Sequence, residues 1–276
     1  MKKVSLLLLV LFTCVLSAQR KPKIKGSRII TEVQKELQPY NAIKLMDDLK
    51  IKLQHESVAG YNIIADDNLI DALKFEVIDS VLTIGSFYKI VSKKQLEILV
   101  NYTVLNKVIL NTGSIVMDDM VGGANLAVHT YGDSKIQLNT NATLVGIHME
   151  GNSEGSYSVD ANSLVITLKD KVNAEIQAVS EEISVEMSNG ASSKLEGSTT
   201  RLKADLTGDI DLKAEKLQAV TVEALLQKSS GMRLQALETF NLSSRDKAKT
   251  YLYGNPVITI TEFLDASELI KRDLKK

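Results

Sequence analysis

A repeat of about nineteen residues runs from Leu126 to Tyr253 and constrains the fold more than any other feature of the chain. In each repeat, mostly apolar residues occupy three alternate positions, and these triplets recur at nearly constant spacing. A single repeat of this size cannot bury its apolar face and needs a neighbour on either side, so the period indicates a stacked architecture. The triplets are Leu126/Val128/Thr130, Val145/Ile147/Met149, Leu164/Ile166/Leu168, Ile183/Val185/Met187, Leu202/Ala204/Leu206, Val220/Val222/Ala224 and Phe240/Leu242/Ser244.

The alternation of apolar and polar residues is typical of strands with one buried face. A second, weaker alternation follows each triplet, as at Ile136/Leu138 and Ile210/Leu212/Ala214. A spacing of two excludes a helical repeat. No proline lies between Tyr40 and Asn255, as central strands require. The sequence therefore predicts an all-β fold, a right-handed parallel β-solenoid with about nineteen residues per coil.

A glycine, asparagine or aspartate stands two residues after most triplets. These residues tolerate a left-handed backbone, so we expect one recurring corner geometry. After Ala224, Leu226 occupies that position and Gly231 comes later, which predicts an enlarged loop. The corner residues are Gly132, Gly151, Asp170, Asn189, Gly208 and Asp246.

The two ends of the solenoid should be irregular, because solenoids need atypical segments that shield their terminal coils. We expect a single domain over 28–276, in which 28–105 form the N-terminal cap and first coils, 106–254 the regular coils, and 255–276 the C-terminal cap and tail. The coil before Leu126 fits the repeat with a one-residue slip. In the first region, strands are predicted at 43–53, 61–65, 74–78, 81–85 and 96–100, with a short helix at 68–73 that Asp66 or Asp67 caps.

The N-terminus carries the features of an export signal. Lys2 and Lys3 precede an apolar stretch that is too short to span a bilayer, and Leu16-Ser17-Ala18 resembles a cleavage site. We therefore expect residues 1–18 to be a signal peptide and 19–27 a linker. Cleavage would remove Cys14, the only cysteine; the alternative is that Cys14 is lipidated. No second segment has membrane-spanning length, so we expect an exported protein in the periplasm, on the outer-membrane surface or outside the cell.

The charge balance argues against nucleic acid as a partner. The chain holds 33 basic and 34 acidic residues, and loss of Lys2 and Lys3 brings the net charge to about −3. Such a chain has no broad attraction for polyanions.

Outward positions of the repeat form one column that could carry chemistry: His129, His148, Thr167, Glu186, Asp205, Glu223 and Ser243. Stacking at about 4.8 Å per coil would bring its carboxylates together. The simplest interpretation is a solvated face, with Lys203 relieving part of the repulsion near Asp205. Glu186, Asp205 and Glu223 are the carboxylate candidates for a metal ion, a weak Ca²⁺ site, although a flat ladder supplies few of the oxygens that Ca²⁺ needs.

Two further alternatives concern the same column. His129 and His148 could bind a metal as a pair, but no third nitrogen or sulfur ligand is evident. Neighbouring acids could also serve a glycan hydrolase or lyase. The chain lacks tryptophan and has only 5% aromatic residues, which leaves few platforms for sugar rings, and Tyr131, Tyr157, Tyr251 and Tyr253 are expected to pack in the core or caps. No nucleophile motif, phosphate loop or metal-ligand cluster occurs in the sequence, so we predict no catalytic residue and no cofactor.

The beginning and the end of the predicted domain resemble those of a known family. The stretches Asn41–Leu45, Leu49–Leu53, Tyr61–Ile70 and Val81–Ile84 are similar to the opening of the head GIN domain family, and Tyr253-Gly254-Asn255-Pro256 is similar to its ending. Met46-Asp47-Asp48 departs from the pattern, since a glycine is expected there. The resemblance covers about Tyr40 to Leu269. It implies an exported bacterial β-solenoid of a family described as putative autotransporter adhesins: a non-enzymatic binding or structural module of the cell envelope, with an envelope glycan or a protein as its ligand.

Overall fold

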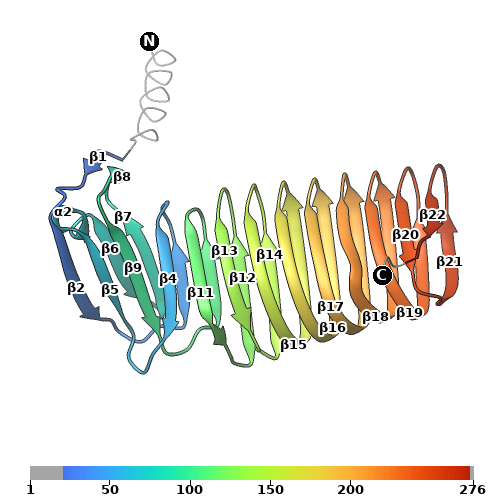
Figure 1. Cartoon of the computed structure of the whole chain (residues 1–276), viewed down its shortest axis with the longest axis horizontal. Helices are drawn as coiled ribbons and strands as arrows, with labels where there is room; N and C mark the ends of the chain where they lie inside the picture. Colours follow the sequence, from blue (N-terminus) through green and yellow to red (C-terminus); the bar gives the residue numbers. More distant parts are fainter. Residues whose placement is uncertain (1–20, 274–276) are drawn as a thin grey trace, which may run out of the picture.

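The protein is an elongated stack of β-strands (Figure 1). The computed structural model describes residues 21–273. The expected signal peptide, residues 1–18 with Cys14, lies outside the described residues. Within 21–273, no helix combines the length and the apolar character that crossing a bilayer requires.

The chain winds from Lys107 onward into parallel coils. Val145 lies beside Leu164, and Leu164 beside Ile183, a step of nineteen residues in each case. Val108 lies beside Val128, one residue more than the regular step, so the predicted slip is present. The parallel β-solenoid predicted from the sequence is confirmed. Its strands are β10 (Lys107–Leu110), β11 (Ser114–Val121), β12 (Asn125–Thr130), β13 (Lys135–Thr140), β14 (Leu144–Met149), β15 (Glu154–Asp170), β16 (Asn173–Asn189), β17 (Ser192–Gly208), β18 (Asp211–Lys228), β19 (Gly231–Ser244), β20 (Lys249–Tyr253), β21 (Val257–Phe263) and β22 (Glu268–Lys271).

The predicted corner geometry is also confirmed. All six predicted corner residues have a positive φ, and the value is 67° at Asp170 and 72° at Asn189. The column repeats because each coil makes the same tight turn above the turn of the coil before. Gly151 illustrates the close packing, since a Cβ there would lie 2.9 Å from the backbone nitrogen of Gly132.

The prediction of an enlarged loop after Ala224 is wrong. Leu226 points into the core as the third residue of its triplet and lies beside Leu206, while Lys228 makes the left-handed corner with φ 60°. The inward triplet is therefore Val222/Ala224/Leu226. The extra residue sits earlier in β18, where Ala214 and Glu215 lie opposite the single residue between Lys194 and Glu196, so that Glu196 lies beside Lys216. This bulge shifts the following residues of β18 by one position, and further register shifts between β18 and β19 bring Phe240 beside Val222.

The N-terminal region does not follow the chain order of the coils. The first coil, made of β3 and β4, is flanked on one side by β10 and β11 and on the other by β7 and β9. Beyond them, β5 and β6 run antiparallel to β9 and β7, and β2 runs antiparallel to β5. The elements are β1 (Lys23–Lys25), β2 (Ile30–Glu36), β3 (Ala42–Leu45), β4 (Lys50–His55), β5 (Gly60–Asp66), α2 (Asp67–Ile70), β6 (Leu73–Ile78), β7 (Val81–Ser86), β8 (Lys89–Ser92) and β9 (Leu96–Tyr102).

Local features of this region differ from expectation in three places. The single strand predicted at 43–53 is broken by a turn between β3 and β4. The short helix begins at Asp67 instead of Asn68, and its N-cap residue Asp66 makes no side-chain capping bond, because its carboxylate accepts a hydrogen bond from the backbone of Lys94 at 2.8 Å. The segment expected to be a linker, 19–27, contains β1, which pairs with β8.

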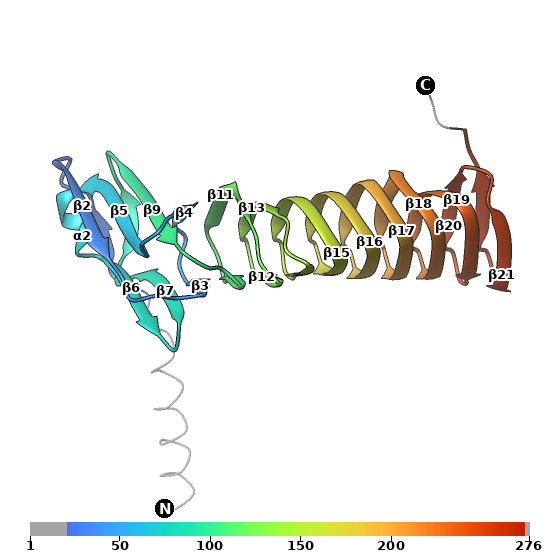
Figure 2. The same cartoon turned by 90° about the horizontal axis from the view of Figure 1, so that it is seen from below.

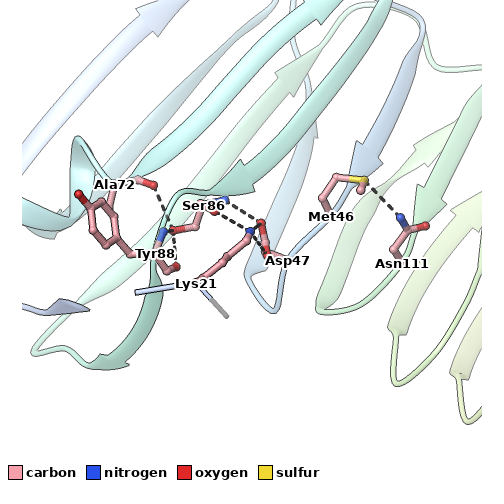
Figure 3. Close-up of polar contacts among 7 residues, drawn as sticks. All are labelled: Lys21, Met46, Asp47, Ala72, Ser86, Tyr88 and Asn111. Atoms are coloured by element: carbon pink, nitrogen blue, oxygen red, sulfur yellow. Dashed lines mark hydrogen bonds and ion pairs between the residues drawn. The ribbon is translucent and has the colours of Figure 1, made fainter. Parts of the chain in front are cut away.

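The turn that lacks the expected glycine is held by its neighbours (Figure 3). The Asp47 carboxylate accepts hydrogen bonds from the backbone N–H of Ser86 at 2.8 Å and from Lys21 Nζ at 2.6 Å. The neighbouring coils supply the glycines: a Cβ at Gly113 would lie 2.7 Å from the Asp47 carbonyl oxygen, and one at Gly85 would lie 2.9 Å from its carboxylate. The close approach of adjacent coils thus requires glycine on the flanking coils instead of in the turn itself.

In the segment 255–276, which we expected to form a cap and tail, the described residues 255–273 continue the solenoid. β21 pairs with β19 and β22 with β20, so these strands form a further parallel coil at the end opposite β2 (Figures 1 and 2). Ile258 and Ile260 stack on the buried residues Phe240 and Leu242 but remain 44% and 47% exposed. No described residue covers this last coil from the outside.

Candidate ligand-binding face

The structure divides the carboxylates that the sequence placed in one column. Glu186 and Asp205 lie side by side on adjacent coils, as expected. Glu223 does not continue the column, because the one-residue shift before it places Glu223 beside Lys203, and Leu225 beside Asp205. The expected triad is therefore a carboxylate pair followed by a lysine–glutamate neighbour pair. Among residues 21–273, no group of three or more His, Cys, Asp or Glu side chains is arranged to hold a metal ion.

The two histidines lie directly beside each other on β12 and β14. Their ring centroids are 5.6 Å apart, and the His148 Nε2 atom is 2.8 Å from Glu150 Oε1. Lys169 Nζ is 3.5 Å from the same carboxylate oxygen. Burial, together with nearby Lys107 and His148, lowers the pKa of His129, and the hydrogen bond from His148 lowers the pKa of Glu150. The contact with Glu150 thus orients the ring of His148.

Of the four tyrosines expected in the core or caps, Tyr157 is buried and Tyr251 points outward. Tyr157 is buried at 3% exposure, as predicted. Tyr251 points outward on β20, with the guanidinium carbons of Arg233 and Arg272 lying 5.7 and 5.6 Å from its ring centroid. Two guanidinium groups from neighbouring coils therefore lie against this ring, an arrangement typical of cation–π contacts.

A concave part of the surface lies on a different strand face from the Glu186–Asp205 pair. We call it the trough: three adjoining cavities that share lining residues and cross the coils from β9 and β4 to β17. Their volumes are about 500, 440 and 220 Å³. Lys50 and Val116 line both the first and the second, and Gln137, Ser156 and Glu175 line both the second and the third.

The trough changes character along its length. At the cap end its apolar lining comes from partly exposed side chains of β5, β9 and β11: Ile64, Leu96, Leu99 and Val116. Further along the solenoid the lining is amide and hydroxyl groups: Gln137, Asn139, Ser156, Ser158 and Gln177. These groups both donate and accept hydrogen bonds and carry no charge.

Six of the charged residues that line the trough form three ion pairs. Lys52 Nζ lies 2.9 Å from Asp118 Oδ2, Lys135 Nζ lies 2.7 Å from Glu154 Oε2, and Lys194 Nζ lies 2.9 Å from Glu196 Oε1. Exposed pairs of this kind add little to stability. Their effect here is to leave a surface with alternating charge and no net attraction for a polyanion.

Sequence reasoning did not identify the trough. The relevant signal is present, because Gln137, Asn139 and Gln177 occupy outward positions of the second alternation in each repeat. The signal is a column of uncharged side chains, Asn139, Ser158 and Gln177, which lie beside one another on successive coils. The concavity at the cap end could not be found in this way, since it depends on β5 pairing antiparallel to β9.

Comparison with known proteins places this geometry in context. The family model described as putative auto-transporter adhesin, head GIN domain, matches residues 39–168 and 152–256. The two matches overlap, as expected for a chain built of repeats. No curated protein matches the chain.

Solved structures share the fold. A putative adhesin from Parabacteroides distasonis has a TM-score of 0.66 at 15% identity, covering 91% of this chain and 100% of the other. A putative adhesin from Parabacteroides merdae gives 0.60 at 14% identity, covering 91% and 99%. A putative lipid binding protein from Parabacteroides distasonis gives 0.64 at 15% identity, again covering 91% and 99%. At these identities the likeness shows a common fold alone.

Proposed function

This chain belongs to the head GIN domain family of putative auto-transporter adhesins, and on that premise we propose that it is an exported, non-enzymatic binding module of the cell envelope. The observation that carries the proposal is the trough, whose three cavities adjoin one another across several coils. A rigid solenoid presents such a surface in a fixed shape, so an extended ligand can bind along it with little ordering of the protein.

The lining of the trough favours an extended polypeptide as the ligand. Amide and hydroxyl groups such as Gln137 and Ser156 can pair with a peptide backbone, and the apolar end near Leu99 and Val116 can receive apolar side chains. Sugar rings usually stack on exposed aromatic faces, and the residues that line the trough offer none apart from Tyr157, which is buried. An envelope glycan is therefore the less favoured ligand.

The position of the acidic residues supports a function without catalysis. Glu186 is exposed on a face apart from the trough, and Glu223 lies beside Lys203 instead of joining Asp205. A reducing-end assay on envelope polysaccharides checks this point. Turnover that is lost in Glu186→Gln would contradict a binding role alone.

Photo-crosslinking in cells that export the protein tests the binding proposal. A photoreactive residue at Gln137, in the middle of the trough, is compared with one at Val165, an exposed position on the other strand face. We expect a peptide adduct at position 137 that exceeds the adduct at 165, and loss of that adduct when Val116→Arg fills the trough but not in Val165→Arg. Equal crosslinking at both positions would overturn the proposal, and a glycan adduct at 137 would overturn the choice of a polypeptide.

A further inference from the structure

The last coil of the solenoid exposes side chains that every earlier coil buries. Ile258 and Ile260 on β21 stack on Phe240 and Leu242, which are both fully buried, yet they stay 44% and 47% exposed. Phe263 is 42% exposed in the same row. The coil therefore presents an apolar end and an unpaired strand edge to solvent.

The terminal strands at the two ends of the molecule differ in the number of charged residues along their exposed edge. Exposed strand edges invite pairing with other chains, and proteins usually protect them with charge. The terminal strand at the N-terminal end, β2, carries Glu32, Lys35 and Glu36 along seven residues. β21 also has seven residues, and its only charged one is Glu262.

We propose that this C-terminal end binds the same end of a second copy of the chain, forming a two-fold symmetric, end-to-end dimer. This inference goes beyond the proposed ligand-binding role and does not depend on it. A single added strand would cover β21 but leave β22 and the apolar interior between them open. The end of an identical coil has the same cross-section, so it covers β21, β22 and the interior together.

The direction of the strands favours tail-to-tail over head-to-tail contact. A two-fold axis places each terminal strand antiparallel to its counterpart, so the start of one lies near the end of the other. β22 begins with Glu268, and Arg272 follows its last residue on the same strand face, so antiparallel pairing brings an acidic and a basic side chain together across the interface. These charges add to the contacts that Glu268 makes with Lys249 and Arg272 with Tyr251 in the same chain. The charged edge of β2 offers no comparable match to the apolar β21.

Sedimentation velocity on the chain lacking residues 1–18 tests the proposal. Because the contact covers one coil end per copy, it lies at the small end of specific interfaces, and measurements should run from about 5 to about 500 µM. We expect a monomer at the low end and a dimer at the high end. Ile260→Lys should weaken association at least tenfold. Val165→Lys is the matched control, since Val165 is 49% exposed and lies on a mid-solenoid face; it should dimerise like the unmodified chain.

A cysteine pair gives a second readout that does not depend on a charged variant. Cys14, the only cysteine of the sequence, is removed with residues 1–18, so Ile260→Cys introduces a single thiol into the shortened chain. Mild oxidation should produce a disulfide-linked dimer in Ile260→Cys much faster than in Val165→Cys. A monomer at every concentration, unchanged association in Ile260→Lys, species larger than a dimer, or equal crosslinking at both cysteines would each overturn the proposal.

Discussion

Glu223 lies beside Lys203 on the adjacent coil, and Lys203 is two residues along the strand from Asp205 of the Glu186–Asp205 pair. The two carboxylates of that pair repel each other, whereas Glu223 has a cationic neighbour. At about one strand spacing, the repulsion is worth about 1 kcal/mol in water. Neutralising Asp205 and neutralising Glu223 should therefore change the stability of the protein differently.

We expect Asp205→Asn to stabilise the protein slightly, by about 0.5 kcal/mol, without any added ion. Glu223→Gln is the matched control and should give no gain, because it removes an attraction to Lys203. Urea denaturation with and without Ca²⁺ measures both. A Ca²⁺-dependent rise in stability that Asp205→Asn abolishes would show that the pair binds a cation.

Ile166 and Thr167 test the register of the coils. Ile166 is buried at 1% exposure, while Thr167 points outward on the same strand. Ile166→Asp should cost several kcal/mol, about 3 or more, because it buries a charge without a partner. Thr167→Asp should cost far less. Equal losses in chemical denaturation would contradict the nineteen-residue register.

Gly155 leaves the space that the ring of Tyr157 occupies in the core. A Cβ at Gly155 would lie 2.9 Å from Cζ of that ring. Gly155→Ala should therefore destabilise the protein by about 1–3 kcal/mol, through overpacking. Gly146→Ala is the control, because a Cβ there meets nothing within 4 Å. In the double variant with Tyr157→Leu, Gly155→Ala should cost much less than it does alone, and a full additive cost would exclude the steric explanation.

The histidine cluster predicts that stability falls in mild acid. Burial lowers the pKa of His129 below its ordinary 6.5, so the folded state binds this proton less readily than the unfolded state. The contribution is fully present above pH 6.5 and is lost as pH falls below it. The lowered pKa of Glu150 adds a second loss below about 4.5. We expect the urea midpoint to fall between pH 7.5 and 5.5, and to fall less in His129→Gln; an equal fall in both would assign the effect to other groups.

Processing can be checked by mass spectrometry of protein recovered from the envelope. Cleavage after Ala18 predicts a chain that begins at Gln19 and carries no lipid. A lipid on Cys14 at the mature terminus would contradict it. That result would also make the protein membrane-anchored.

The sequence by itself determined the features that local chemistry controls. Alternating apolar residues such as Leu164, Ile166 and Leu168 point inward because successive side chains of a strand face opposite sides. Corners such as Asn189 are left-handed because so few residue types tolerate that backbone. Because the coils repeat, the inward positions and the corner of one coil predict those of the next. The same reasoning failed at Glu223, because the bulge near Glu196 shifts the register without any change in composition.

Only the tertiary structure decided where non-repeating parts of the chain meet. The coil of β7 and β9 lies outside β3 and β4 although it follows them in sequence, and the antiparallel β5 beside it forms the apolar end of the trough. The exposure of Ile260 likewise reflects the absence of a neighbour among the described residues and not its own side chain, which matches the buried Leu242. Contacts between strands distant in sequence depend on packing and loop closure, which no local pattern records.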